Sequence, residues 1–298
     1  MTDQPQPLRA ALWMTGAIAS FTAMAIAGRQ VSHLHDSFEI MTARSLVGFA
    51  IMVIYTTVAG RWAQIGRRRL GGHALRNLVH FTGQNLWFWA LTMIPLAQVF
   101  ALEFTSPIWV ILLSPLLLGE KLTRARLLAA GLGFAGILIV ARPDLTQLNP
   151  GVLAAAASAV FFASSSILTK ALTRNENILT ILFWLALMQF GFGLIGAGYD
   201  GAVSLPDRTT LPWLALIGCA GILAHLSLTQ ALSVAPASYV VPLDFVRLPV
   251  IAVVGAVIYA EPLDPYVLLG GAVIFAGIWI NIRAELRSNR NNRNVTNL

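Results

Sequence analysis

Apolar runs of bilayer length, repeated along the chain, constrain this sequence more than any other feature. A helix needs about 20 mainly apolar residues to cross the hydrocarbon core of a membrane. Short polar stretches separate ten such runs, at 10–28, 38–59, 73–93, 96–118, 125–141, 151–171, 177–198, 210–229, 237–259 and 265–282. The sequence therefore predicts an all-α integral membrane protein of about ten transmembrane helices, retained in the lipid bilayer.

Composition excludes several classes of function. Hydrophobic residues make up 57% of the chain and charged residues 11%, whereas about a quarter of a typical soluble domain is charged. The net charge of +7 could suggest a nucleic-acid partner, but the basic residues gather in loops between apolar runs, where they orient a membrane protein. We therefore predict no nucleic-acid partner. The single cysteine, Cys219, allows no internal disulfide framework and no thiol-rich metal site.

Lysine and arginine divide unevenly between the two sides of the predicted bundle. One side holds fifteen: Arg9, Arg61, Arg67, Arg68, Arg69, Arg76, Lys121, Arg124, Arg126, Lys170, Arg174, Arg283, Arg287, Arg290 and Arg293. The other side holds only Arg29, Arg142 and Arg208, and Arg44 and Arg247 fall inside predicted spans. Because cytoplasmic loops retain positive charge, both termini are predicted to be cytoplasmic, in a bacterial inner (plasma) membrane.

Two stretches of the chain repeat one another 141 residues apart. ALTMIPLAQVFALEF begins at Ala90 and ALSVAPASYVVPLDF begins at Ala231, and both end on an acidic residue followed by Phe. At the same offset Glu120 aligns with Glu261, and no gap is needed from residue 90 to residue 281. The first helices match more weakly, at an offset of 140. The chain is therefore predicted to contain two copies of one five-helix unit.

A unit with an odd number of spans forces its second copy into the membrane upside down. The loops agree, since GEKLTRAR after the fourth span is basic, while its counterpart AEPLDPY after the ninth carries no base. We assign residues 1–148 to the first repeat, 149–283 to the second, inverted repeat, and 284–298 to a basic cytoplasmic tail. Prolines 107, 115, 242 and 249 fall inside the fourth and ninth spans, which should bend or locally unwind there.

The sequence resembles the EamA family of the drug/metabolite transporter superfamily. The resemblance rests on Pro-Leu-Ala at 95–97, SPIWVILLSPLLLGEKL at 106–122, GFAGILIV at 133–140 and IFAGIWI at 274–280. It implies a ten-helix fold around a central cavity, lined mainly by helices 1, 3, 4, 6, 8 and 9, and transport of small metabolites by alternating access. It also implies that the fifth and tenth helices are peripheral and form the contact of a homodimer.

Three charged residues inside the predicted spans are the leading candidates for a substrate or coupling site. Glu103 and Asp244 occupy equivalent positions of the two repeats, and Arg247 lies one turn after Asp244. Charges within spans are costly and usually face a cavity or pair with one another. A purely structural salt bridge among these residues, joined by Arg44, is the alternative. Protons are considered as the coupling ion.

Further polar and aromatic residues could line the same cavity. They are His80, Gln84 and Asn85 on the third span, His225 on the eighth, and Phe161 and Ser165 on the sixth. Histidine near a carboxylate can carry protons, although each histidine could equally be satisfied by a backbone carbonyl. His33 and His35 beside Asp36 are expected to be solvated loop residues, and neither a metal nor a cofactor is predicted.

These residues favour a secondary active transporter and argue against an enzyme. No HExxH, GxSxG or other catalytic motif occurs, and no ATP-binding motif. Paired acids, a base, imidazole and amide groups suit a small amino-acid-like or zwitterionic metabolite, and family resemblance favours export. The alternative within the class is an importer of a vitamin or nucleoside-like metabolite, and a non-transporting membrane sensor is a more remote one.

Overall fold

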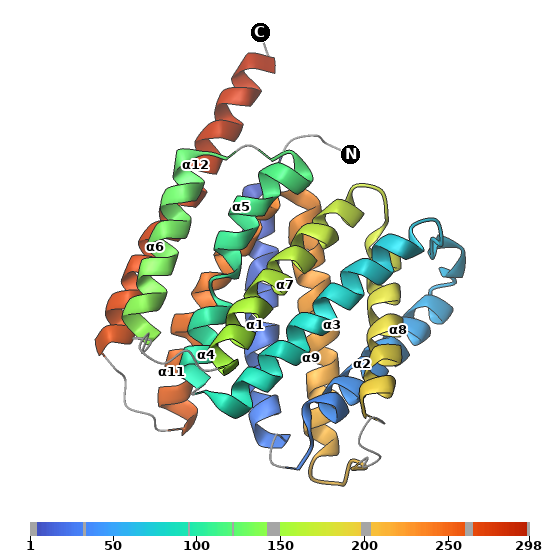
Figure 1. Cartoon of the computed structure of the whole chain (residues 1–298). Coiled ribbons are helices and arrows are strands. Elements are labelled where there is room, and N and C mark those ends of the chain that lie inside the picture. The colour runs from blue at the N-terminus through green and yellow to red at the C-terminus, as the bar shows by residue number, and fades with distance from the viewer. Residues whose placement is uncertain are drawn as a thin grey trace.

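The structure, a computed structural model, is a bundle of helices (Figure 1) and describes residues 5–31, 34–94, 96–120, 122–141, 150–197, 204–259 and 265–296. The first half contains α1 (Pro7–Val31), α2 (Ser37–Val58), the short 3-10 helix η1 (Trp62–Gln64), α3 (Leu70–Met93), α4 (Leu96–Glu103), α5 (Ser106–Leu118) and α6 (Arg124–Ala141). The second half contains α7 (Pro150–Thr173), α8 (Ile178–Ala197), α9 (Leu211–Val234), α10 (Ala237–Val240), the 3-10 helix η2 (Val241–Val246), α11 (Arg247–Tyr259) and α12 (Pro265–Thr296).

The predicted repeat is visible in the helix boundaries themselves. Adding 141 to the first residue of α2, α3, α4, α5 and α6 gives the first residue of α8, α9, α10, α11 and α12. The starts of α1 and α7 agree to within two residues of the same offset. The repeat thus extends over the first helices as well, where the sequence match is weak.

The two halves run in opposite directions. In Figure 1, α1 runs away from the end of the bundle where the N terminus lies, whereas its counterpart α7 runs toward that end, and the C terminus lies at that end too. The helix pairs follow the same pseudo-symmetry, because α1 packs on α9 as α7 packs on α3, while α2 packs on α8 and α6 on α12. Each half therefore buries its apolar faces mainly against the other half.

The fourth and ninth spans are interrupted, as their prolines predict. The fourth breaks into α4 and α5 at residues 104–105, and Pro107, in the first turn of α5, has no N–H to contribute. The ninth passes from α10 through η2, which contains Pro242, into α11. Pro115 lies inside α5 without ending it. The interruptions occupy equivalent places in the two repeats.

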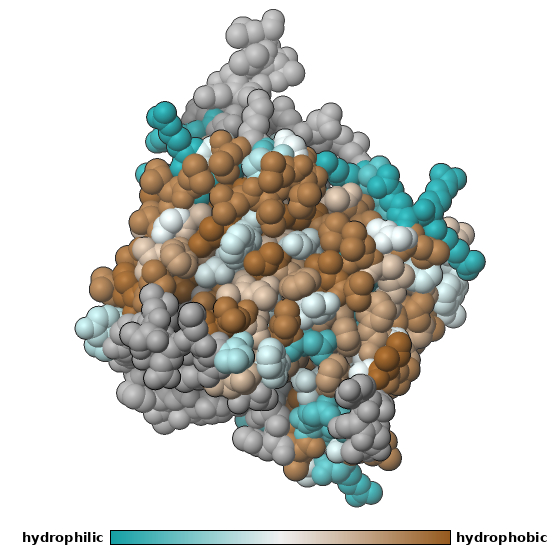
Figure 2. Space-filling view, in the orientation of Figure 1, coloured by the Kyte–Doolittle hydropathy of each residue, from teal (hydrophilic) through white to brown (hydrophobic). Residues whose placement is uncertain are grey.

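The surface has the character of a membrane protein. Within the described ranges, five helical segments are long and apolar enough to cross a membrane, by length and composition alone: Pro7–Gly28, Ser37–Val58, Pro150–Thr173, Ile178–Ala197 and Leu211–Val234. Two shorter apolar segments there are Ser106–Leu118 and Leu269–Ala284. Leu116 is 81% exposed and Ile195 77%, which is favourable in lipid and costly in water. Figure 2 shows apolar side chains across the face in view, with most strongly hydrophilic ones toward its ends.

The edge of the bundle is formed by α6 and α12, which pack against each other (Figure 1). Glycine permits this close approach, since a Cβ at Gly136 would lie 2.6 Å from Ile274 Cγ1 and one at Gly277 3.0 Å from the Ala129 carbonyl oxygen. These glycines are themselves equivalent in the two repeats. The helix α12 extends beyond the predicted last span at 265–282, so the basic tail assigned from residue 284 is helical as far as Thr296.

Polar side chains link neighbouring segments at both ends of the bundle. At the end with the termini, the Glu120 carboxylate accepts hydrogen bonds from the backbone N–H groups of Ala237 at 2.9 Å and Ser238 at 3.2 Å. At the opposite end, His35 contacts Glu39 and Thr210, each at 3.2 Å. His35 is thus buried in a hydrogen-bond network and is not the solvated residue that the sequence suggested, while His33 lies outside the described residues.

Thr210 ends a loop that caps α9. The Asp207 carboxylate accepts hydrogen bonds from the hydroxyl and amide groups of Thr209 and Thr210, at 2.7–2.9 Å. These bonds lower the pKa of Asp207 to about 2, and the bond from the Thr209 hydroxyl has the largest effect.

Candidate functional site

Glu103, Asp244 and Arg247 meet in the interior, where the interrupted spans of the two repeats face each other. One terminal nitrogen, Nη2 of Arg247, donates to Glu103 Oε1 and to Asp244 Oδ2, both at 2.9 Å. The side chains of Arg247 and Glu103 are each 12% exposed and that of Asp244 20%. The predicted triad therefore exists, and its central guanidinium connects the first repeat to the second.

The chain breaks position these three residues. Glu103 is the last residue of α4, Asp244 lies in η2 and Arg247 is the first residue of α11. A break frees backbone groups from the helical ladder, and the side chains beside it point into the bundle interior. The cation is also covered by aromatic rings, with its Cζ 5.2 Å from the Phe21 ring centroid and 4.9 Å from that of Phe104, distances typical of cation–π contacts.

The triad is not saturated with hydrogen bonds. Asp244 Oδ1 and Arg247 Nε are buried and have no partner among the described residues. An unpaired buried acceptor and an unpaired buried donor each cost about 1–3 kcal/mol. The site consequently retains one acceptor and one donor that a polar solute could satisfy.

A second polar group, the basic cluster, consists of Arg44, Arg76, His80 and His225. Nη2 of Arg44 donates to Nε2 of His225 at 2.9 Å, and the rings of His80 and His225 lie edge to face with centroids 5.1 Å apart. His80 and His225 are 9% and 3% exposed. Both nitrogens of His80, and Nδ1 of His225, lack a hydrogen-bond partner in the described part of the chain.

Arg76 extends the basic cluster along α3. Its Nε donates to the Thr169 hydroxyl at 3.0 Å and its Nη1 to Asn77 Oδ1 at 2.9 Å. Gln189 Nε2 in turn donates to the Asn77 backbone oxygen at 2.9 Å. Arg76 is only 3% exposed, so it lies inside the bundle, although the charge count placed it on the basic side. The charge pattern of a single sequence could not separate it from the neighbouring loop arginines.

One aromatic ring contacts both the triad and the basic cluster. Phe21 on α1 contacts Arg247 of the triad and also the His225 ring, with centroids of the two rings 6.1 Å apart. The sequence alternative that placed Arg44 in the salt bridge of the triad is therefore wrong, because Arg44 binds His225 instead. Phe21 and Phe104 were not selected from the sequence, where they look like ordinary apolar residues.

The remaining predicted residues lie along the interface of α3 and α7. Gln84 and Ser165 are buried, and Gln84 Oε1 and Asn85 Oδ1 have no partner within the described chain. Asn85 Nδ2 donates to the Phe81 carbonyl of its own helix at 2.8 Å. Phe161 packs against Gly83, where an added Cβ would lie 2.9 Å from Phe161 Cβ. Gln84 and Asn85 thus offer free acceptors, whereas Phe161 serves mainly helix packing.

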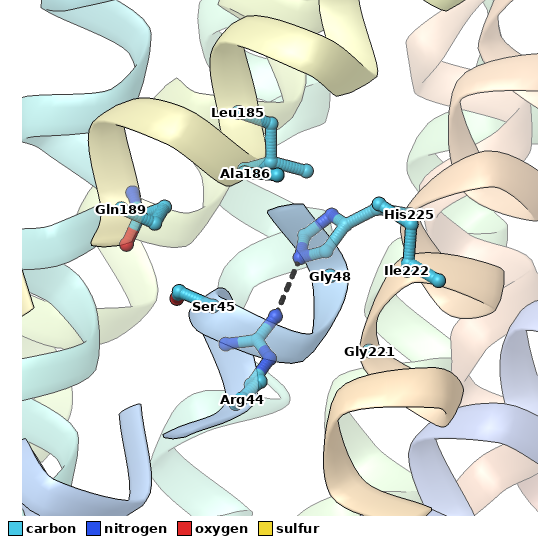
Figure 3. Close-up of a pocket in the computed structure, with 9 residues that line it drawn as sticks. All are labelled: Arg44, Ser45, Gly48, Leu185, Ala186, Gln189, Gly221, Ile222 and His225. Carbon is cyan, nitrogen blue, oxygen red and sulfur yellow. Dashed lines mark hydrogen bonds between the residues drawn. The ribbon is translucent and has the colours of Figure 1, made fainter. Parts of the chain in front are cut away.

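A small pocket borders the basic cluster (Figure 3). It encloses about 20 Å³, room for about one water molecule. It is lined by Arg44, Ser45, Gly48, Leu185, Ala186, Gln189, Gly221, Ile222 and His225. These residues belong to α2, α8 and α9, which are the second, seventh and eighth predicted spans. The family resemblance assigned the eighth span to the cavity wall but not the second or the seventh.

Known proteins match this chain over nearly its whole length. Residues 8–142 and residues 149–283 each match the EamA-like transporter family. The chain belongs to the EamA-like transporter family. It is a multi-pass membrane transporter and not an enzyme. The two matched segments coincide with the two halves related by the offset of 141 residues.

Several relatives are named for what they carry. A riboflavin transporter of Vibrio cholerae serotype O1 is 31% identical over 99% of this chain and 100% of its own length. A riboflavin transporter of Brucella anthropi is 33% identical over 74% of this chain and 79% of its own length. An S-adenosylmethionine uptake transporter of Rickettsia felis is 23% identical over 93% of each chain. These names describe those proteins.

A solved crystal structure shares the fold. It superimposes with a TM-score of 0.79 at 18% sequence identity, covering 93% of this chain and 98% of the other. At this identity the likeness concerns the architecture alone.

Proposed function

We propose that this EamA-family transporter takes up riboflavin, or a closely related flavin, by alternating access. The proposal rests first on the similarity to the Vibrio cholerae riboflavin transporter, which is 31% identical along essentially both entire chains. It adopts the vitamin-importer alternative in place of an exporter of zwitterions.

The interior chemistry suits a flavin. The isoalloxazine ring is flat and rich in carbonyl and ring-nitrogen acceptors, and its ribityl chain carries hydroxyl groups. Phe21 and Phe104 offer aromatic faces, Arg247 Nε is a free donor, and Asp244 Oδ1 is a free acceptor. Apolar and aromatic walls with a few polar groups are typical of sites for such ligands.

The interior charge disfavours S-adenosylmethionine as the substrate. This compound carries a sulfonium cation, and the buried guanidinium groups of Arg44 and Arg76 have no carboxylate partner within the described residues. Repulsion between like charges is strong where water is excluded. A neutral flavin avoids this cost.

The pocket beside Arg44 is too small for such a substrate. A flavin needs a site of at least about 300 Å³, far more than the 20 Å³ of this pocket. Our proposal therefore places the flavin at the triad, with the two halves moving around it as in other carriers built from inverted repeats. The break at Phe104 and Thr105, and η2 opposite, are the flexible points for that motion.

We place both termini in the cytoplasm. They lie at one end of the bundle (Figure 1), and the loop residues Arg67, Arg68 and Arg69 belong to the basic side even after Arg76 is removed from the count. The repeats are assigned to residues 1–148 and 149–283. Proton coupling and a homodimer through α6 and α12 stay predictions.

Uptake by the purified protein in liposomes tests the proposal. Radiolabelled riboflavin should enter saturably, and unlabelled riboflavin should compete while S-adenosylmethionine and amino acids should not. Ile195→Ala, at an exposed position of α8, should transport like the wild type. Saturable entry of S-adenosylmethionine or an amino acid, without entry of riboflavin, would refute the assignment.

A further inference from the structure

The basic cluster holds more positive charge than its surroundings neutralise. Among the described residues, Arg44 hydrogen-bonds only to an imidazole nitrogen, and Arg76 only to a hydroxyl and an amide. No carboxylate in the described ranges lies within 4.0 Å of either guanidinium, whereas Arg247 has two. The triad and the basic cluster together therefore hold three guanidiniums and two carboxylates. An uncompensated charge at membrane depth is costly and usually marks an ion or substrate path.

The hydrogen-bond pattern at Arg44 leaves several donors without an acceptor. A guanidinium only donates, so His225 Nε2 must accept from Arg44 Nη2, and the neutral ring then carries its proton on Nδ1. That Nδ1 is buried with no partner. Nε and Nη1 of Arg44 likewise have no hydrogen-bond partner among the described residues. The surroundings of the Arg44 guanidinium thus hold more donors than acceptors among the described residues, and the unpaired acceptor beside the pocket is Gln189 Oε1.

The small pocket lies at this place. Figure 3 shows the Arg44 guanidinium between Ser45 and the His225 ring, with Gln189 across the gap. Gly221 allows the Arg44 side chain to lie against α9, since a Cβ there would lie 2.6 Å from Arg44 Nε. The enclosed volume of about 20 Å³ accepts a single small ion or water molecule, and excludes a phosphate ester or a flavin in this conformation.

We propose that this pocket, between α2, α8 and α9, binds a small monovalent inorganic anion of the halide class. A halide accepts from several donors at once and brings the charge of the three guanidiniums and two carboxylates to zero. The site goes beyond flavin uptake, because neither its donors nor its volume depends on a bound flavin. An anion there would stabilise the conformation described here, in which the Arg44 guanidinium lines the pocket.

Direct binding of radioactive chloride to the purified protein tests the proposal. The protein, without flavin, is held in nanodiscs at constant ionic strength with gluconate as the other anion. Saturable chloride binding, with competition by bromide and none by gluconate or sulfate, is expected. Arg44→Gln should weaken chloride binding at least tenfold and Ser45→Ala severalfold. The matched control Arg61→Gln, at an exposed arginine between α2 and η1, should leave it unchanged.

Three results would overturn the anion site. The wild type could fail to bind chloride saturably, gluconate or sulfate could compete as well as bromide, or folded Ser45→Ala protein could bind chloride with wild-type affinity. Competition by riboflavin at one flavin per chloride would show that the donors belong to the flavin site. The wild-type measurement stands even if Arg44→Gln does not fold. Chloride binding without riboflavin uptake would refute only the proposed substrate, and uptake without chloride binding only the anion site.

Discussion

Replacing Glu103 with Gln keeps the size of the side chain and removes the negative charge that joins the two repeats. Arg247 donates to Glu103 Oε1 at 2.9 Å, and this contact links the end of α4 to the start of α11. Because Arg247 also retains Asp244 at 2.9 Å, the guanidinium is not left unpaired. We therefore expect Glu103→Gln to fold and to insert into the membrane, but to transport poorly.

The size of the effect follows from the contact. A hydrogen bond to a charged partner contributes about 1.5–3 kcal/mol, less than the roughly 3–5 kcal/mol lost when a buried ion is stripped of its only partner. If this contact exists only in the closed conformation, its loss shifts the closed–open equilibrium by about 10- to 150-fold. A carrier must pass through its closed state in each cycle, so initial uptake should fall at least about tenfold.

Riboflavin uptake into liposomes measures this effect, and a double-mutant cycle isolates the contact. Thermal unfolding in detergent is compared for Glu103→Gln, Arg247→Gln and the double variant. The coupling free energy should be about 1.5–3 kcal/mol, because the residues touch directly. Thr82→Ala serves as a control that removes a polar group of α3 without altering the triad, since the exposed Thr82 hydroxyl donates to the Leu78 carbonyl of its own helix.

Two outcomes would refute this reasoning. Uptake by Glu103→Gln within twofold of the wild type would show that the carboxylate is dispensable for transport. A coupling free energy near zero, with uptake lost, would show that Glu103 acts on the substrate or coupling ion and not through Arg247.

Two further predictions concern the frame around the site. A Cβ at Gly133 on α6 would overlap the ring of Phe245 in η2, so Gly133→Ala should lower the free energy of unfolding by about 1–3 kcal/mol. Gly131→Ala on the same helix meets nothing within 4 Å and should raise it by up to about 1 kcal/mol; equal melting temperatures for the two variants would contradict the packing. Glu120→Gln should cost about 0.5–2 kcal/mol by weakening its bonds to the start of α10 at Ala237 and Ser238, and an unchanged melting temperature in detergent would contradict that capping role.

Much of the architecture follows from local properties of the sequence. Spans were recognisable because the bilayer imposes a minimum apolar length, and proline marked the interrupted fourth and ninth spans because it cannot donate to the helical ladder. The continuation of α12 to Thr296 was missed, since a polar amphipathic segment gives no hydropathy signal. Arg76 was misplaced because only packing against Thr169 distinguishes it from the loop arginines nearby.

The sequence by itself determined the membrane class, the two repeats and the equivalence of Glu103 and Asp244 in those repeats, because periodicity and internal homology are properties of the chain alone. Only the tertiary structure decided that Arg247 binds both acids and that Arg44 donates to His225 instead. It also decided that Phe21 contacts both the triad and the basic cluster. Such choices depend on which helices pack together, here α1 with α9 and α2 with α8 and α9. These contacts join residues from 144 positions apart, as in Glu103 and Arg247, to 226 apart, as in Phe21 and Arg247, beyond the reach of any local pattern.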